Sequence, residues 1–526
     1  MKSIGEAFIE HLVKRNVDVV FGIPGVHTIE HYRGLSGSGI LHVTPRHEQG
    51  VAFMADGYAR VSGKPGVALV ITGPGVTNTI TAMGQARADS VPILVISGAN
   101  PLESVGKGRG HLHELPDQHA TLSTVAIKSF QIKSEDDLAL AMDGAFKIFT
   151  SGRPGPVHIE LPRDVAKIKC TNPLVEPICI EKPKPGEPEI SAAVSLINSA
   201  ELPVILAGGG VRNHEEGLRN LAERLDAPVV QTVNARGMMH QHELGVPASP
   251  SLSTVRKLIE ASDLVLAFGT EFGRTDYDMY ETGTMPEIRG LIHVDISASQ
   301  LERQAADVKI QADAGETISL LLEHLPEVDR VGGTGAARAA DARTAALDEI
   351  GEDMRSVTDI LSAIRDASPS SIMVGDSTQP IYAGNLYYDH DHPGGWFNAS
   401  TGFGALGYGI PAAIGAALSD TDARVICLTG DGGAQFSLPE LMTAVDQKLP
   451  VIFIIWNNYG YGEIESSMKR ANVDVVGCSP SPPDFSHIAL ACGMPFHRAA
   501  PESGALSELI RGILSQKGPV LLEIAI

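Results

Sequence analysis

Two polar turns in the last third of the chain have the composition of a metal and phosphate site. Asp431 stands in a Gly-Asp-Gly-Gly turn after an apolar run, and Asn458 ends the next apolar run. Both side chains offer hard oxygen ligands, and Mg²⁺ takes one or two carboxylates together with phosphate oxygens. The carbonyl of Gly460 is a third candidate ligand, and Gly432 and Gly433 let backbone N–H groups approach a diphosphate. A tight turn or a strand cap would explain either motif alone, whereas the pair at this spacing favours a site for Mg²⁺ and a polyphosphate.

Parallel β-strands are the elements that must position these turns. Short β-branched runs alternate with helical stretches along the chain, which predicts the α/β fold class, with doubly wound parallel sheets covered by helices. Ligands of such sheets bind at the carboxyl ends of the strands, where both turns fall. Residues 171–190 and 329–345 are rich in Pro, Gly or charge and predict linkers. They divide the chain into three predicted domains at 1–170, 190–328 and 346–526.

Composition and charge exclude several classes of function. The formal net charge of −22 argues against a nucleic-acid partner, because neutralising phosphates requires a surplus of Lys and Arg. The five cysteines form no CxxC pair, so neither a disulfide framework nor a zinc site is indicated, and a reducing compartment fits best. The N-terminal segment lacks the apolar core of a signal peptide, and no apolar run approaches the roughly 20 residues of a membrane span. We therefore expect a cytoplasmic enzyme without a membrane or nucleic-acid partner.

The segment GDGGAQFSLPELMTAVDQKLPVIFIIWNN resembles the thiamine-diphosphate (ThDP) motif, in which GDG precedes NN by a little under thirty residues. In that family the Asp, the second Asn and the carbonyl two residues later bind Mg²⁺, which the resemblance carries to Asp431, Asn458 and Gly460. The resemblance implies a pyrimidine-binding, a middle and a diphosphate-binding domain, in that order. Further segments are similar to the acetolactate synthase and benzoylformate decarboxylase superfamily: residues 46–60, 71–78, 152–165 and 402–418.

The resemblance assigns the activating carboxylate to Glu48. Thiamine chemistry requires a shielded carboxyl that hydrogen-bonds the aminopyrimidine N1′, so that the 4′-amino group can act as a base toward the thiazolium carbon. Glu48 follows a strand-like run and begins a helix whose apolar and small residues predict burial. A carboxyl with little water around it keeps its proton more easily. Pairing with the helix dipole would be the commoner explanation for an arbitrary Glu, but the match over residues 46–60 favours the catalytic role.

The resemblance also implies the other cofactor contacts. Leu406 would be the bulky apolar residue that bends the cofactor into a V, although core packing would explain it equally well. The carbonyl of Gly404 would accept the 4′-amino hydrogen. Thr378 and Gln379 would contact the diphosphate, although Ser/Thr clusters are usually loops or caps. The predicted cofactor-binding residues are Glu48, Asn78, Thr378, Gln379, Gly404, Leu406, Gly432, Gly433, Asn458 and Tyr461.

Decarboxylation of a 2-keto acid is the reaction that we expect. The cofactor accepts the electrons that remain when CO₂ leaves, and protonation then gives an aldehyde, whereas attack on a second keto acid gives an acetohydroxyacid. Ala99 stands where acetolactate synthases place a glutamine, which disfavours the second outcome. The flavin-associated stretch of that family is replaced by residues 245–255, so FAD is not expected, although it is not excluded. An acetolactate synthase-type carboligase joining two 2-keto acids stays open as the alternative.

Four further strings resemble the decarboxylases of 5-guanidino-2-oxopentanoate: FGIPGVHTIEHYRGL, GKGRGHLHELPDQ, GTEFGRTDYDMY and WNNYGYGEIESSM. A guanidinium tail calls for carboxylates in bidentate geometry. Glu463 lies where relatives line the substrate pocket, and Glu114 or Asp117 could face it from another subunit. His27 and His113 are candidates for moving protons or orienting the substrate carboxylate, with His27 the predicted catalytic histidine. Solvated acids and structural histidines are the competing explanations for each of these residues.

The resemblance implies a homodimer or a homotetramer, because in this family the carboxylate and the diphosphate site come from different subunits. A catalytically inactive scaffold is disfavoured because Glu48, Asp431 and Asn458 are all present. A nicotinamide oxidoreductase is disfavoured because GPGVTN and GGGVRN both lack the last glycine of GxGxxG.

Overall fold

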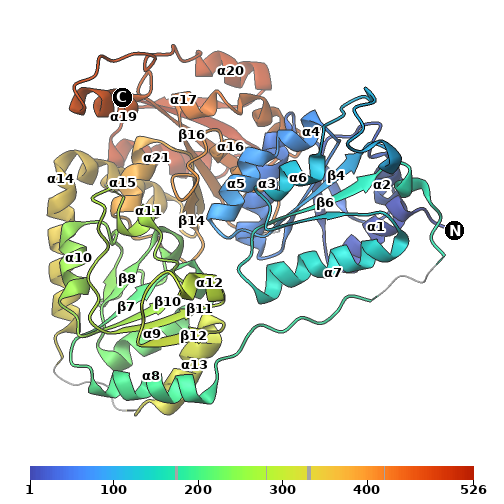
Figure 1. Cartoon of the computed structure of the whole chain (residues 1–526). Helices are drawn as coiled ribbons and strands as arrows, with labels where there is room; N and C mark the ends of the chain where they lie inside the picture. The colour runs from blue at the N-terminus through green and yellow to red at the C-terminus, as the bar shows by residue number, and fades with distance from the viewer. Residues whose placement is uncertain (172–175, 280, 328–332, 420) are drawn as a thin grey trace. The chain divides into compact units, whose positions relative to one another are not determined.

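Three six-stranded parallel β-sheets and their helices build the chain (Figure 1). The computed structural model describes all residues except 172–175, 280, 328–332 and 420. The α/β fold class predicted from the alternating runs is confirmed. Backbone contacts divide the chain into two compact units. The first unit comprises Met1–Glu181, Phe403–Arg498 and Gln516–Glu523, and the second comprises Lys182–Gly402, Ala499–Ser515 and Ile524–Ile526.

The first sheet has the strand order β2-β1-β3-β4-β6-β5, with every neighbouring pair parallel. Strands β3 and β4 are buried along their whole length, which explains why both are unbroken runs of apolar and small residues. The strands are β1 (Val19–Gly22), β2 (Leu41–Val43), β3 (Gly66–Val70), β4 (Ile93–Ala99), β5 (Lys128–Gln131) and β6 (Pro156–Pro162). The helices of this segment are α1 (Ile4–Val13), α2 (Ile29–Leu35), α3 (Glu48–Ser62), α4 (Pro74–Thr77), α5 (Ile80–Ala88), η1 (Leu102–Ser104), α6 (Gln118–Ser123), α7 (Glu135–Ser151) and η2 (Val165–Lys167).

The second sheet has the order β12-β11-β10-β7-β8-β9 and lies within the second unit. Helix α9 packs on its core through Leu218, Leu221 and Leu225, whose spacing of three and four residues places them on one helix face. The strands are β7 (Pro203–Ala207), β8 (Val229–Gln231), β9 (Gly245–Val246), β10 (Leu264–Phe268), β11 (Leu291–Asp295) and β12 (Val308–Gln311). The helices are α8 (Glu187–Ser199), η3 (Gly209–Val211), α9 (Glu215–Leu225), η4 (Val233–Ala235), α10 (Ser253–Glu260), α11 (Arg274–Tyr277), α12 (Ala298–Leu301) and α13 (Ala314–His324).

The third sheet has the order β14-β13-β15-β16-β18-β17. Gly430 at the end of β15 is paired with Trp456 near the end of β16, so the two predicted site turns leave the sheet side by side. The strands are β13 (Ile372–Gly375), β14 (Trp396–Asn398), β15 (Val425–Gly430), β16 (Val451–Asn457), β17 (Phe496–Ala499) and β18 (Val520–Ala525). The helices are α14 (Gly335–Ala367), α15 (Gln379–Leu386), α16 (Gly409–Ala417), α17 (Asp431–Ala434), η5 (Leu438–Glu440), α18 (Leu441–Asp446), α19 (Gly462–Arg470), α20 (Phe485–Cys492) and α21 (Ser503–Ile513).

The second predicted linker, residues 329–345, is largely helical. Helix α14 begins at Gly335, so the linker interpretation is wrong for residues 335–345. Alanine has the highest helix propensity of the amino acids. The alanine-rich run AARAADARTAA therefore favours a helix directly after the glycines. Residues 328–332 of this stretch lie outside the described residues.

Helices α3 and α16 pack closely together inside the first unit, and glycines at their crossing permit this approach. A Cβ atom on Gly57 would lie 2.0 Å from the carbonyl oxygen of Ala412, and one on Gly415 would lie 1.9 Å from that of Met54. The helix that begins with Glu48 is therefore held against the helix that follows Leu406. None of the helices in the described part of the chain is both long and apolar enough to cross a membrane.

Candidate active site

The three predicted metal ligands converge at the ends of β15 and β16. The side-chain oxygen of Asn458 lies 2.8 Å from the carbonyl oxygen of Gly460 and 3.1 Å from Oδ1 of Asp431. Three acceptor oxygens this close together repel one another unless a cation lies between them. The alternative is that the Asn458 amide is rotated by 180°, so that its nitrogen donates an N–H group to each of the other two oxygens. The other Asp431 oxygen, Oδ2, is buried and has no hydrogen-bond partner among the described residues. Burial raises the pKa of Asp431, and a cation would offset that cost, so the donor set fits Mg²⁺.

The glycines after Asp431 leave room for an aromatic ring beside the turn. A Cβ atom on Gly432 would lie 2.5 Å from Cε1 of Tyr461, so any larger residue would displace that ring. Gly432 and Gly433 are both buried in α17. The structure thus brings the predicted residues Gly432 and Tyr461 together next to the predicted metal ligands.

Glu48 is the first residue of α3 and is half-buried. Asn78, which ends α4, donates a hydrogen bond of 2.9 Å from Nδ2 to Oε2 of Glu48. A Cβ atom on Gly75 would lie 3.7 Å from the other carboxylate oxygen, so the backbone of α4 also borders Glu48. The predicted burial applies to the rest of α3, where residues 50–60 are buried.

The loop that carries Gly404 and Leu406 lies against α5. The amide N–H of Ala405 donates to Oε1 of Gln85 at 3.1 Å, and Gly404 has a positive φ of 73°. Leu406 is only half-buried, and Gly404 is exposed. Core packing therefore does not account fully for Leu406. Thr378 and Gln379 belong to the second unit, where Thr378 is buried and precedes α15 and Gln379 begins it.

Buried His27 and half-buried His113 form a pair of neighbouring rings. Their ring centroids lie 5.5 Å apart, and His27 is 3% exposed. Neither ring nitrogen of His27, nor Nδ1 of His113, has a hydrogen-bond partner among the described residues. Burial, reinforced by the nearby charges of His113 and Arg163, lowers the pKa of His27. The His27 ring, whose pKa burial lowers, therefore keeps polar atoms without a hydrogen-bond partner in a buried setting.

The three predicted substrate carboxylates each have local partners. Glu114 accepts backbone N–H groups of Arg109 and His111, and Asp117 accepts the N–H of Ala120 as the N-cap of α6. Glu463 accepts the guanidinium of Arg470 at 2.8 Å. The backbone bonds of Glu114 and Asp117 give these two carboxylates a local structural role in the loop before α6.

Sequence reasoning missed two buried side chains that hold the site's backbone. Glu440 accepts the N–H groups of Arg46 and His47, directly before Glu48, at 3.0–3.1 Å. Gln118 bonds the turn before α4. A carboxylate after a proline in LPEL gives a weak signal for the first, and nothing in the sequence around Gln118 points to the second.

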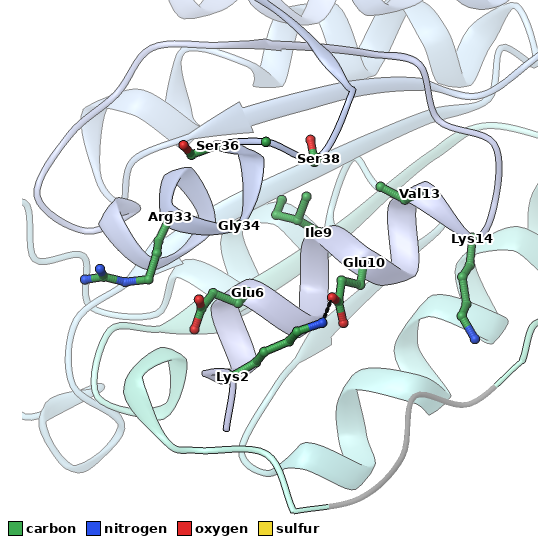
Figure 2. Close-up of a pocket in the computed structure, with 11 residues that line it drawn as sticks. Lys2, Glu6, Ile9, Glu10, Val13, Lys14, Arg33, Gly34, Ser36 and Ser38 are labelled. Atoms are coloured by element: carbon green, nitrogen blue, oxygen red, sulfur yellow. Dashed lines mark hydrogen bonds and ion pairs between the residues drawn. The ribbon is translucent and has the colours of Figure 1, made fainter.

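A surface pocket in the N-terminal segment has no tie to the predicted site (Figure 2). It is lined by residues of α1, α2 and the turn after α2, and its cations already have carboxylate partners. Lys2 pairs with Glu10, and Arg33 pairs with Glu30 at 3.1 Å. Because these charges are already neutralised, the pocket does not call for an anionic ligand.

Comparison with known proteins decides the family. The N-terminal TPP binding domain of thiamine pyrophosphate enzymes matches residues 2–121, the central domain matches 190–321, and the C-terminal TPP binding domain matches 376–524. The chain belongs to the thiamine pyrophosphate enzyme family. Thiamine pyrophosphate is the same compound as ThDP, so the predicted cofactor class is confirmed.

Relatives that align with nearly the whole of this thiamine pyrophosphate enzyme are named either as a decarboxylase or as acetolactate synthases. The chain is 40% identical over 530 residues to "Probable 2-ketoarginine decarboxylase AruI" of Pseudomonas aeruginosa, covering 99% of this chain and 94% of that protein. It is 30% identical over 539 residues to the acetolactate synthase isozyme 1 large subunit of Escherichia coli, with 99% and 94% covered. It is 32% identical over 521 residues to the acetolactate synthase of Mycobacterium bovis, with 93% and 82% covered.

Proposed function

We propose that this ThDP enzyme is a Mg²⁺-dependent decarboxylase that converts a 2-keto acid, 5-guanidino-2-oxopentanoate, to an aldehyde and CO₂. One observation supports this choice of reaction above all. The chain is 40% identical, over nearly the whole of both chains, to a relative named as a probable 2-ketoarginine decarboxylase. The two acetolactate synthases compared above share 30% and 32%. The site geometry supports the cofactor chemistry that both reactions share.

Asp431, Asn458 and Gly460 would hold Mg²⁺ through the three converging oxygens, with the cofactor's diphosphate completing the coordination. When bound, ThDP supplies the nucleophilic carbon and the electron sink of the reaction. Glu48 would hold a proton against the aminopyrimidine nitrogen, and the Asn78 amide would keep its carboxylate in place. FAD has no proposed role in this reaction.

The histidine pair would handle the proton that converts the decarboxylated substrate to an aldehyde. A neutral imidazole offers one N–H donor and one acceptor nitrogen, so it can both orient a carboxylate and pass on a proton. His27 has both of these atoms free in a buried setting. His27 would give a proton to the substrate carbon and regain one from solvent by way of His113, whose ring centroid lies 5.5 Å from that of His27, so both imidazoles return to their starting state.

Glu463 is the candidate acceptor for a guanidinium tail. Its carboxylate accepts a hydrogen bond of 2.8 Å from the guanidinium of Arg470, which supports a guanidinium group as its partner. Both side chains are well exposed, so a substrate guanidinium can compete for the same oxygens. Glu114 and Asp117 stay as secondary candidates, each with a backbone partner of its own.

We also propose that the active enzyme is at least a homodimer, with the sites at subunit interfaces. Large aromatic side chains beside the site turns are more than half exposed: Phe403 54%, Phe436 59% and Tyr459 57%. Exposed aromatic residues gathered around a site commonly mark an interface. Light scattering of the active enzyme would test this proposal, and a fully active monomer would overturn it.

Product analysis tests the proposed reaction. The purified protein, with ThDP and Mg²⁺ but without FAD, is incubated separately with 5-guanidino-2-oxopentanoate and with pyruvate. We expect CO₂ and 4-guanidinobutanal from the first compound and little acetolactate from the second. Acetolactate from pyruvate without turnover of the guanidino acid would replace the proposal by the acetolactate synthase reaction.

A further inference from the structure

Gln118 bridges two backbone segments that border the candidate active site. Its side chain is 6% exposed and lies at the start of α6. The side-chain oxygen accepts the Thr72 hydroxyl at 2.6 Å and the Gly73 N–H at 3.0 Å. The side-chain nitrogen donates to the Ser97 hydroxyl at 3.1 Å and to the Gly98 carbonyl at 3.0 Å. One amide group thus joins the segment after β3 to the end of β4.

A buried carboxylate determines the orientation of this amide. Glu160 on β6 is 1% exposed, and its Oε2 accepts Nε2 of Gln118 at 2.8 Å. Its other oxygen, Oε1, accepts Nε2 of Gln131 at 2.6 Å. Because the carboxylate requires donors, the nitrogen of Gln118 must face Glu160. Its oxygen therefore faces Gly73.

The Gly73 side of the bridge leads to Glu48. Gly73 has a φ of 63° and immediately precedes α4, which is only four residues long. Asn78 at the end of α4 donates to Glu48 at 2.9 Å, and Gly75 borders the same carboxylate. A shift of the turn at Gly73 would therefore move the donor that holds Glu48.

Both ends of the bridge also lead to the histidine pair. A Cβ atom on Gly73 would lie 2.5 Å from the carbonyl oxygen of His113, so the His113 backbone rests on this turn. A Cβ atom on Gly98 would lie 2.8 Å from Cβ of His27. The two backbone segments that Gln118 bridges are thus the segments that contact His113 and His27.

We propose that Gln118 is a positioning residue that fixes Glu48 relative to the His27–His113 pair. The inference rests on the proposed roles of Glu48 and of the histidines. Misplacement of a catalytic group by about 1 Å can lower a rate about 100-fold. The Gln118 amide makes five hydrogen-bond contacts, three of which share its two N–H hydrogens, and these contacts restrain such a shift.

The test compares Gln118→Met with a matched control, Gln131→Met. Both substitutions remove one amide donor from Glu160, so both should lower the thermal unfolding temperature, and Gln118→Met should lower it further because four more contacts are lost. Only Gln118→Met also releases the turn at Gly73. The measurement is the rate at which the C2 hydrogen of bound ThDP exchanges with deuterium before any substrate is added, together with the Kd for ThDP.

We expect exchange to be at least about tenfold slower in Gln118→Met and within about twofold of the wild type in Gln131→Met, with little change in the Kd for ThDP. Equal exchange rates in the two variants would overturn the inference. Glu48→Gln, measured in parallel, separates this result from failure of the proposed function, because a wild-type exchange rate there would remove Glu48 itself from the mechanism. If Gln118→Met does not fold, Thr72→Val removes one hydroxyl partner of Gln118, and exchange at the wild-type rate in that variant would count against the inference.

Discussion

The side-chain amide of Asn78 donates a 2.9 Å hydrogen bond to Oε2 of Glu48, and so joins the end of α4 to the start of α3. Glu48 is only half-buried, so this bond, rather than enclosure by apolar side chains, holds the carboxylate in the structure. The relationship makes Asn78 a partner of the proposed activating group, Glu48, as well as a predicted cofactor contact.

Asn78→Asp should therefore slow the enzyme more than it destabilises it. The substitution keeps the shape of the side chain but replaces a donor with a second carboxylate beside Glu48, which repels it. We expect kcat to fall by about tenfold or more. Steady-state kinetics at saturating ThDP would check this, with the thermal unfolding temperature as the control for folding. An unchanged kcat would show that the Asn78 bond plays no part in catalysis.

Asp431→Asn should weaken cofactor binding by on the order of 100-fold, because one charged metal ligand is lost. The Kd for ThDP in the presence of Mg²⁺ would be measured by titration, with Asp422→Asn, an exposed acid of the same segment, as the matched control. Dialysis against a chelator should abolish activity in the wild type, and added Mg²⁺ should restore it. Full activity after complete metal removal would contradict the metal assignment.

His27→Ala should lower turnover by an order of magnitude or more and leave the Kd for ThDP unchanged, because a proton-transfer group contributes roughly 10²–10⁴-fold. The free ring nitrogens of His27 motivate this expectation. His42→Ala, at a half-buried histidine on β2, serves as the comparison. Turnover at the wild-type rate in His27→Ala would remove the histidine pair from the reaction.

Acid should destabilise the fold partly through His31. Burial lowers the pKa of this ring to about 4, whereas the ordinary value is about 6.5. The unfolded chain therefore binds the proton more readily, and the stabilisation is present above pH 6.5 and is lost as the pH falls below it. Between pH 7 and pH 5 this one group should lower the free energy of unfolding by about 2 kcal/mol.

His31→Phe, whose ring would keep the edge contact with Phe8 at 5.4 Å, should remove that part of the pH dependence. His487→Phe, at a side chain that is 78% exposed, should not. Denaturant unfolding at the two pH values measures the difference, and equal pH dependence in wild type and His31→Phe would refute the assignment.

The fold was predictable because its signals are local. Buried parallel strands such as β4 and β16 are continuous apolar runs, and both faces of each are covered. The glycine-rich composition before residue 335 predicts a linker, whereas the alanines that follow have a high helix propensity and form the start of α14. Over residues 335–345 the propensity of the alanines is the stronger effect.

Candidate site residues could be predicted from the sequence only where they belong to short motifs. Asp431, Asn458 and Gly460 follow two paired strands, so their convergence followed from topology. Gln118 could not be found in this way, because its partners lie 20–46 residues away in the chain and meet it only in the folded sheet. Glu440 likewise reaches the start of α3 across 394 residues.

The most direct test of the account is the rate of CO₂ release from 5-guanidino-2-oxopentanoate by the wild type and by Glu48→Gln, both saturated with ThDP and Mg²⁺. We expect steady CO₂ release by the wild type and a rate lower by roughly 10²–10⁴-fold in Glu48→Gln. Equal rates in the two proteins, or no CO₂ from the wild type, would contradict it.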